Sequence, residues 1–315
     1  LFRIIETLKA KGVTFIYVSH RMEEIKRIGD RATIFRDGAL TGEIDDCKKA
    51  DMDQVINMIV GRTLDEKFPH RESHIGEVAL EVDDFQIPNT IYDISFKVHK
   101  GEVLGFSGLV GSGRTSTAKA IIGAIPRTCG TIKIDGKPVK INNPSDAIAC
   151  GIGYLPEDRK YEGLLLTKTV KENISLPSLR RKFSRGIVIN SRKERDSAEE
   201  YKEKLRIKTP SINRMTKFLS GGNQQKVVFA KWLCSEANIY IFDEPTRGID
   251  VGAKSEIYQI INDLVAQGAA VIVISSELPE ILGICDRVIV MRDGRITANI
   301  DRADATQEKI MSYSI

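Results

Sequence analysis

The segment Gly108-Leu109-Val110-Gly111-Ser112-Gly113-Arg114-Thr115 decides the fold that we expect. It matches the pattern G-x-x-x-x-G-K-[ST], with Arg114 where the pattern has lysine. The apolar run 103–107 before it suits a buried parallel strand, and a helix-like run opens at Thr115. In such a unit, glycines let backbone N–H groups point into one hollow, and the helix N-terminus adds positive potential. The segment therefore predicts an anion site, although a plain glycine-rich turn remains the alternative at this point.

The composition is that of an ordinary globular protein, with 315 residues, 42% hydrophobic and 29% charged. The 47 basic and 43 acidic residues are mixed along the chain, so the net charge of +4 does not indicate a nucleic-acid partner. Five scattered cysteines without a C-x-x-C pair indicate a reducing compartment and no structural zinc. The apolar windows are strand-sized, so we expect any membrane role to be peripheral.

The two ends of the chain contain an internal repeat. Shifting residues 1–45 by 256 positions aligns them without a gap, and the matches include Gly12 with Gly268, Asp30-Arg31 with Asp286-Arg287, and Arg36-Asp37-Gly38 with Arg292-Asp293-Gly294. We interpret the first 60 or so residues as the end of an earlier copy of one domain. The chain also starts at Leu1 within an apparent helix. We therefore expect a fragment of a tandem protein, with roughly 200 residues upstream.

The domain boundaries follow from the repeat and from composition. We assign residues 1–66 to the end of the first domain, the polar, proline-containing segment 67–77 to a linker, and 78–315 to the second domain. His70 and His74 fall in this linker and are not interpreted as metal ligands. A charged stretch without β-rich runs predicts a helical insertion at about 168–217. In the first copy we expect a helix at 2–10, a strand at 14–18, a helix at 21–28 and a strand at 31–35.

Two carboxylates follow the apolar run 239–242 directly. The carboxyl end of a buried parallel strand is where α/β proteins bind ligands. There Asp243 would hold Mg²⁺, directly or through water, and Glu244 would orient and polarise an attacking water. The alternative is a strand end with two solvated acids.

A second glycine pair, in Leu219-Ser220-Gly221-Gly222-Asn223-Gln224-Gln225, precedes a helical stretch. Ser220 at the cap position again predicts a helix N-terminus with free N–H groups. One nucleotide does not need two such sites on one domain. We therefore expect this one to reach the nucleotide held by a partner domain.

The segment SGGNQQK at 220–226, followed by FDEPTRGIDVGAK at 242–254, resembles the ATP-binding subunits of ATP-binding-cassette (ABC) importers. The segments GLVGSGRT and YLPEDRKYEGLL and the tandem layout resemble, more narrowly, the importers of monosaccharides such as ribose, galactose and xylose. The resemblance implies an α/β P-loop NTPase fold, with a central mostly parallel sheet, an antiparallel β subdomain and a helical insertion subdomain.

The same resemblance implies ATP and Mg²⁺ as cofactors and ATP hydrolysis coupled to sugar uptake at the cytoplasmic face of the membrane, where the subunit is peripheral. The implied partners are transmembrane permease subunits, indirectly an extracytoplasmic sugar-binding protein, and the first nucleotide-binding domain or a second copy of the subunit. No nucleic-acid partner is implied.

The family's residue roles transfer to matching positions in this chain. Nucleotide contacts are implied for the loop residues Gly108, Leu109, Val110, Gly111, Ser112, Gly113, Arg114 and Thr115, for Ser220, Gly221, Gly222 and Gln224 of the signature, and for Asp250 of the D-loop. Thr115, Asp243 and Glu157 are implied metal ligands, and Glu244 is the implied catalytic base. Phe85 has the spacing of the aromatic residue that stacks on adenine, with core packing as the alternative.

Three positions depart from the family pattern. Arg114 replaces the lysine, Glu157 stands at the glutamine position expected near nucleotide and metal, and Ser276 stands at the catalytic switch-histidine position. The repeat pairs Ser276 with His20 of the first copy. We therefore expect an asymmetric pair of sites. Hydrolysis would occur mainly at the first-domain site, completed by His20 and this signature, while the loop at 108–115 binds nucleotide mainly to keep the domains together.

Other protein classes remain as alternatives. One is a soluble ABC ATPase of the translation or DNA-repair type, although the chain lacks C-x-x-C pairs, sustained heptads and a strongly basic linker. Another is a non-enzymatic scaffold, although Asp243 and Glu244 are retained. The sequence does not identify the solute, and nucleosides or autoinducer-type sugars are also open.

Overall fold

The computed structural model describes residues 1–19, 22–36, 39–50, 68–249 and 251–315. The chain divides into two compact units. One comprises residues 1–70 with 250–256, and the other comprises 71–249 with 257–315. Each unit is described by itself below.

The elements of the first unit recur in the second at the offset of the sequence repeat. Helix α1 covers Phe2–Lys9 and α2 covers Met22–Ile28, and β1, Ala32–Arg36, pairs antiparallel with β2, Ala39–Ile44. The matching elements of the second copy are the C-terminal half of α9, Val251–Ala266, then α10, Leu278–Ile284, and the antiparallel pair β13, Arg287–Arg292, and β14, Arg295–Asp301. The two ends of the chain therefore have corresponding secondary structure.

The strand that we expected at 14–18 is not present. Its repeat counterpart is β12, Ala270–Ile274, which is hydrogen-bonded to a parallel neighbour on each side. The described residues contain no strand paired with 14–18, and Ile16 is 95% and Val18 92% exposed. A β-rich segment does not form a strand without neighbours to complete its backbone hydrogen bonds.

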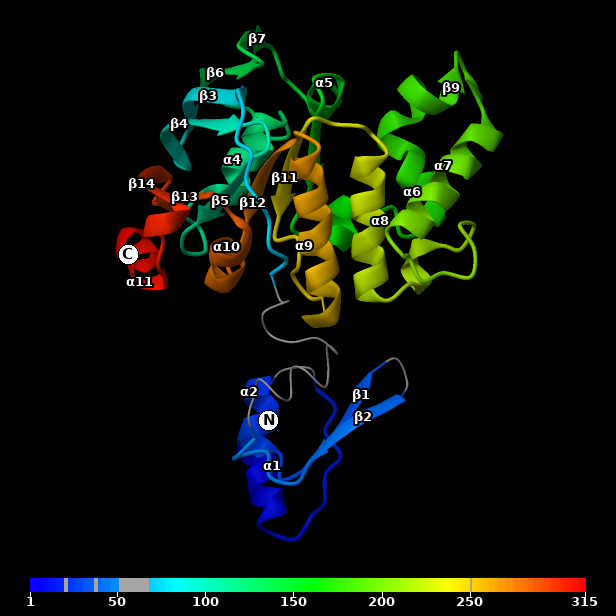
Figure 1. Ribbon diagram of the computed structural model, residues 1–315, viewed down its shortest axis with the longest axis vertical. Helices are drawn as coiled ribbons and strands as arrows, with labels where there is room; N and C mark the ends of the chain where they lie inside the picture. Colours follow the sequence, from blue (N-terminus) through cyan, green and yellow to red (C-terminus); the bar gives the residue numbers. More distant parts are fainter. Residues whose placement is uncertain (20–21, 37–38, 51–67, 250) are drawn as a thin grey trace. The chain divides into compact units, whose positions relative to one another are not determined.

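A six-stranded sheet forms the centre of the second unit, in the order β14-β13-β5-β12-β11-β8. Strands β5, Val103–Ser107, β8, Ile152–Leu155, and β11, Ile239–Asp243, are buried along their whole length. All neighbours are parallel except β14. Continuous apolar runs are typical of parallel strands covered on both faces. Helices α4, Arg114–Ile121, α8, Gly221–Leu233, and α9 lie around this sheet (Figure 1).

A separate antiparallel sheet has the order β4-β3-β6-β7 and lies beside the β14 end of the central sheet (Figure 1). Its strands are β3, Val78–Ile87, β4, Ile91–His99, β6, Cys129–Ile134, and β7, Lys137–Val139. Alternate residues of β4 are buried, and Phe96 meets Phe106 of β5 edge-on with ring centroids 5.1 Å apart. The two sheets therefore share one hydrophobic core.

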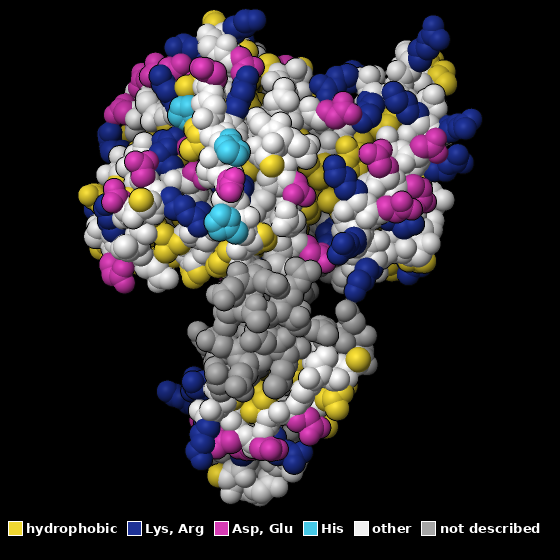
Figure 2. Space-filling view, viewed as in Figure 1, with side chains coloured by type: hydrophobic (Ala, Val, Ile, Leu, Met, Phe, Trp, Pro, Cys, Tyr) yellow, Lys and Arg dark blue, Asp and Glu magenta, His cyan; other side chains and the backbone are white. Residues whose placement is uncertain are grey.

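The insertion is mostly helical, as predicted, with α6, Val170–Ser175, and α7, Ser191–Lys204, joined by single turns at Leu176–Ser178 and Leu179–Phe183. It also contains a small hairpin that we did not expect, β9, Ser184–Arg185, with β10, Val188–Ile189. Strands of two residues are too short for a period-2 pattern to reveal. Acidic and basic side chains are interspersed over this region (Figure 2), as on a solvated face.

The remaining short elements are α5, Pro144–Ala149, a π-helical turn at Arg159–Gly163, 3₁₀ turns at Thr216–Phe218 and Arg302–Asp304, and α11, Gln307–Ser314. Among the described helices, none has the length and apolarity needed to cross a bilayer.

Phe85 lies on β3 inside the shared core and is 0% exposed. The Arg127 guanidinium lies over its ring, 4.8 Å from the centroid. Gly130 adjoins the ring so closely that an added Cβ would be 2.5 Å from the Phe85 Cδ1. Of the two roles that the sequence left open, the structure shows core packing, and the ring does not reach a surface where it could stack on adenine.

Replacing Phe85 by alanine should therefore lower the free energy of unfolding by about 3–5 kcal/mol, because it leaves a cavity in the core. Phe85→Leu, which keeps most of the volume, should cost less than about 1.5 kcal/mol. Urea denaturation of both variants measures this. Unchanged stability with weakened ATP binding would instead assign the ring to the nucleotide.

Candidate nucleotide site

The loop from Gly108 to Gly113 joins the buried end of β5 to the first turn of α4. Two of its glycines are required by the backbone. Gly108 has φ +142°, and an added Cβ would lie 2.2 Å from the Met291 carbonyl oxygen. Gly113, the N-cap of α4, has φ +101° and lies against the Gly294 backbone. The loop can therefore turn tightly enough to present its N–H groups at the helix N-terminus.

The other loop residues include exposed side chains and an unpaired polar group. Leu109 and Val110 are exposed at the tip, while Ser112 is buried and its hydroxyl has no hydrogen-bond partner among the described residues. The N-terminus of α4 has no side-chain cap. Unpaired donors at a helix N-terminus are suited to binding an anion such as phosphate.

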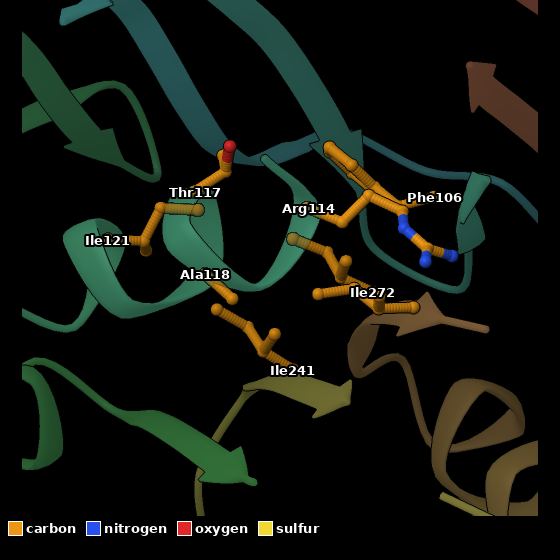
Figure 3. A pocket seen from close by; sticks show the side chains of 8 residues that line it. Phe106, Arg114, Thr117, Ala118, Ile121, Ile241 and Ile272 are labelled. Carbon is orange, nitrogen blue, oxygen red and sulfur yellow. The ribbon is translucent and has the colours of Figure 1, made fainter. Parts of the chain in front are cut away.

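Arg114 is not a free cation beside the loop. Its side chain is 9% exposed, and Nη1 donates a 2.7 Å hydrogen bond to the Ser275 carbonyl oxygen after β12. Figure 3 shows the guanidinium extending away from the apolar side chains of Ala118 and Ile121 beneath α4. Burial lowers the pKa of Arg114, and the nearby carboxylates of Glu244 and Asp243 oppose that shift.

Asp243 ends β11 with 0% exposure. Its Oδ2 accepts a 3.3 Å hydrogen bond from the Tyr154 hydroxyl, and its Oδ1 has no partner among the described residues. Burial raises its pKa, while the nearby hydroxyl groups of Thr115 and Tyr154 act in the opposite direction. The hydroxyl of Thr115 is thus beside a buried carboxylate with a free oxygen, which is the donor set that Mg²⁺ bound to a phosphate chain uses.

Glu244 follows with φ +49°, and its N–H donates to the Ile274 carbonyl oxygen at 2.8 Å. This left-handed turn directs the carboxylate to Ser276, whose N–H and hydroxyl donate to it at 2.8 Å and 3.2 Å. Burial raises the pKa of Glu244, against the hydrogen bonds from Ser276 and the charge of Arg114. The structure therefore brings Arg114, Asp243, Glu244 and Ser276 together.

The signature lies at the start of α8, where Ser220 is an exposed N-cap and Gly221 and Gly222 form the first turn. The Ser220 hydroxyl makes no cap bond. Among the described residues, it accepts a hydrogen bond only from the Asn223 side chain. Gln224 is different: it is 5% exposed and donates to the Thr216 carbonyl oxygen. The helix turns Gln224 into the protein, away from the surface where we expected a ligand contact.

Glu157 lies after β8 and forms an ion pair with Arg247. His20 and Asp250, which we also predicted as site residues, fall outside the described residues. Among the described residues, no group of three or more His, Cys, Asp or Glu side chains could hold a metal by itself.

Sequence reasoning missed three contributors to this site. Tyr154 binds Asp243, the Ser275 carbonyl binds Arg114, and Arg159 donates to the carbonyl oxygens of Arg247 and Gly248. Tyr154 and Arg159 do lie within the segment that carried the family resemblance. A backbone carbonyl such as that of Ser275 leaves no signal in a sequence.

Residues 91–247 match the family described as ABC transporter. The chain belongs to this family. The ribose import ATP-binding protein RbsA of Clostridium tetani is 47% identical over 315 residues, which cover all of this chain and 62% of that protein. This chain therefore spans less than two thirds of the length of that curated relative.

Solved structures agree on the fold. A nucleotide-free ATP-binding cassette from an ABC transporter has a TM-score of 0.65 at 20% identity, covering 76% of this chain and 99% of that one. An ATP-binding cassette in its ADP conformation has a TM-score of 0.62 at 22% identity, covering 75% and 94%. The predicted P-loop NTPase fold of ABC ATPases, which bind ATP and ADP, is thereby confirmed.

The raised pKa of Glu244 gives a pH-dependent prediction. Because burial favours its protonated form, the folded state loses stability as pH rises from about 4.5 through the raised pKa. Glu244→Gln should therefore melt at a higher temperature than the parent at pH 7.5, by about 2–4 °C per kcal/mol, and the gain should vanish at about pH 4.

Thermal unfolding between pH 4 and pH 8 measures this effect. Glu203→Gln, at an exposed position on α7, is the control and should show no such trend. A lower melting temperature for Glu244→Gln at neutral pH would mean that the Ser276 hydrogen bonds outweigh the burial cost.

Proposed function

We propose that this chain is part of the two-domain ATP-binding subunit of an importer for a monosaccharide such as ribose. The observation that carries the proposal is the buried Asp243 carboxylate beside Thr115, at the foot of the loop 108–113 and next to Glu244. The substrate class rests on relatives named as ribose import ATP-binding proteins, which share the whole length of this chain.

Mg²⁺ fits the residues at the end of β11. Asp243 Oδ1 is a buried oxygen without a partner among the described residues, and the Thr115 hydroxyl adjoins the same carboxylate. These two side chains would hold the ion, which supplies charge neutralisation for the phosphate chain when bound. The loop N–H groups would hold the phosphates, and Glu244 would orient water and accept its proton.

We further propose that the two sites of the full subunit are unequal. The Arg114 guanidinium donates a hydrogen bond to the Ser275 carbonyl oxygen, and the Glu157 carboxylate forms an ion pair with Arg247. Ser276 has a hydroxyl at the position that corresponds to His20 in the repeat. These features support slow chemistry at the loop 108–115. The exposed Ser220 and its glycines would complete the faster site on the first domain.

A permease segment would bind the apolar hollow between α4, α5 and α8. This hollow has a volume of about 450 Å³, and its lining is mostly apolar, including Ile125, Ile148 and Trp232. The indole of Trp232 contributes to this apolar lining. Grooves of this kind bind an amphipathic helix of a partner protein.

Single-turnover ATP hydrolysis by the full two-domain subunit with its permease tests the unequal sites. Replacing the first-domain counterpart of Glu244 by glutamine should slow turnover at least about a hundredfold, because it removes the proton acceptor of the faster site. Glu244→Gln should leave most of the turnover intact.

The chain of 315 residues alone should hydrolyse little ATP, because the proposed composite site needs both domains. Abolished turnover in Glu244→Gln, with normal turnover in the first-domain variant, would reverse the assignment. Robust hydrolysis by this chain alone would also contradict it.

A charge at the rim of the hollow should release the permease. Ala124→Glu places a carboxylate at an exposed position of the lining, and the affinity for permease should fall about tenfold or more, or at least 1.4 kcal/mol. Ala149→Glu, exposed on α5 outside the lining, is the matched control. Co-purification and binding measurements check this, and equal binding by both variants would exclude the hollow as the docking site.

A further inference from the structure

Two arginines and one glutamate join two loops that are far apart in the sequence. Arg247, after β11, donates to the carboxylate of Glu157, which follows β8. Arg159 in turn donates to the carbonyl oxygens of Arg247 and Gly248 at 2.8 Å and 3.4 Å. We call Glu157, Arg159 and Arg247 the arginine latch.

The latch also touches the signature. A Cβ added to Gly221 would lie 2.8 Å from Arg159 Nη2 and 3.5 Å from the Gly248 carbonyl oxygen. Arg159 thus lies between the first turn of α8 and the loop that leads from β11 to α9. Only a glycine at 221 leaves room for this guanidinium without displacing it.

The backbone around Arg159 is fixed independently. Asp158 caps the π-helical turn by accepting hydrogen bonds from the N–H groups of Lys160 and Tyr161, at 2.9 Å and 3.1 Å. The Nε of Arg159 is buried, without a partner among the described residues. A guanidinium whose terminal nitrogens bind carbonyl oxygens keeps a defined position, because its donors form a rigid fork.

We propose that the arginine latch sets the distance between the signature turn at Gly221 and the loop at Arg247 and Gly248, and so aligns this domain for hydrolysis at the first-domain site. The inference rests on the proposed function, in which the signature completes that site. Its three members are positioning residues, since the contacts that define the latch are made to protein groups.

If the latch only stabilised the fold, its loss would lower the melting temperature; a positioning role predicts a loss of turnover rate instead. The side chains of Arg247 and Glu157 are 63% and 40% exposed, and ion pairs this exposed contribute little to stability. Loss of the pair should therefore leave the melting temperature nearly unchanged. Misplacement of a catalytic arrangement by about 1 Å, in contrast, can cost up to about a hundredfold in rate.

The test measures ATP turnover of the full two-domain subunit with its permease, in the parent and in the Glu244→Gln background. Arg159→Met and Arg247→Ala should each lower kcat about tenfold or more, with less than about a twofold change in KM for ATP. The charge swap Glu157→Arg with Arg247→Glu should recover most of the rate lost in Arg247→Ala. Arg192→Ala, which breaks an exposed ion pair with Asp196 on α7, is the control and should keep the parent rate.

Parent values of kcat in both Arg159→Met and Arg247→Ala would overturn the latch. A loss of kcat accompanied by an equally large loss of thermal stability, with no recovery in the charge swap, would also overturn it. Failure of the proposed function gives a separate signal. If Glu244→Gln alone abolishes turnover, the assignment of the faster site is wrong, and the latch is then judged from the parent background against Arg192→Ala.

Discussion

Burial of the Asp243 carboxylate is the constraint on which the rest of the site depends. Strand β11 has parallel neighbours on both sides, so its last residue is withdrawn from water. An isolated charge in such a place is costly unless hydroxyls or cations compensate it. Thr115, Tyr154 and Arg114 supply that compensation. Thr115 and Arg114 reach it because the loop at 108–113 turns within six residues from β5 into α4, which in turn requires the left-handed glycines.

The parts of the fold that the sequence predicted are those with strong local signals. Strands β5 and β11 were foreseen because a strand covered on both faces must be apolar throughout. The expected strand at 14–18 shows the limit of that reasoning. Its composition is as β-rich as that of β12, but strand formation also depends on neighbours, which the described residues do not provide. The burial of Phe85 likewise depends on β6 and Arg127, more than 40 positions away.

The site was predicted at the level of residues and less well at the level of contacts. The positions of Asp243, Glu244 and Ser276 followed from motif and repeat, and the structure brings them together. The direction of Arg114 did not follow, because a long side chain at a helix start can extend to several partners, and tertiary contacts select one. Glu157 and Arg247 are 90 positions apart, so no local pattern could link them. For Gln224, the signature suggested a ligand contact, but the periodicity of α8 turned the side chain inward.

The three residues that depart from the family pattern, Arg114, Glu157 and Ser276, have one property in common. Each has a hydrogen-bond or ion-pair partner within the protein. Arg114 is held by the Ser275 carbonyl, Glu157 by Arg247, and Ser276 by Glu244. A cation that must bind a phosphate would first have to give up a buried hydrogen bond, and leaving a buried partner unpaired costs about 1–3 kcal/mol. Under the proposed function, chemistry at this loop therefore starts from a disadvantage, whereas nucleotide binding through the backbone N–H groups of the loop does not. Each of the three substituted residues thus has a partner within the protein, which supports the proposed role of this loop in holding nucleotide.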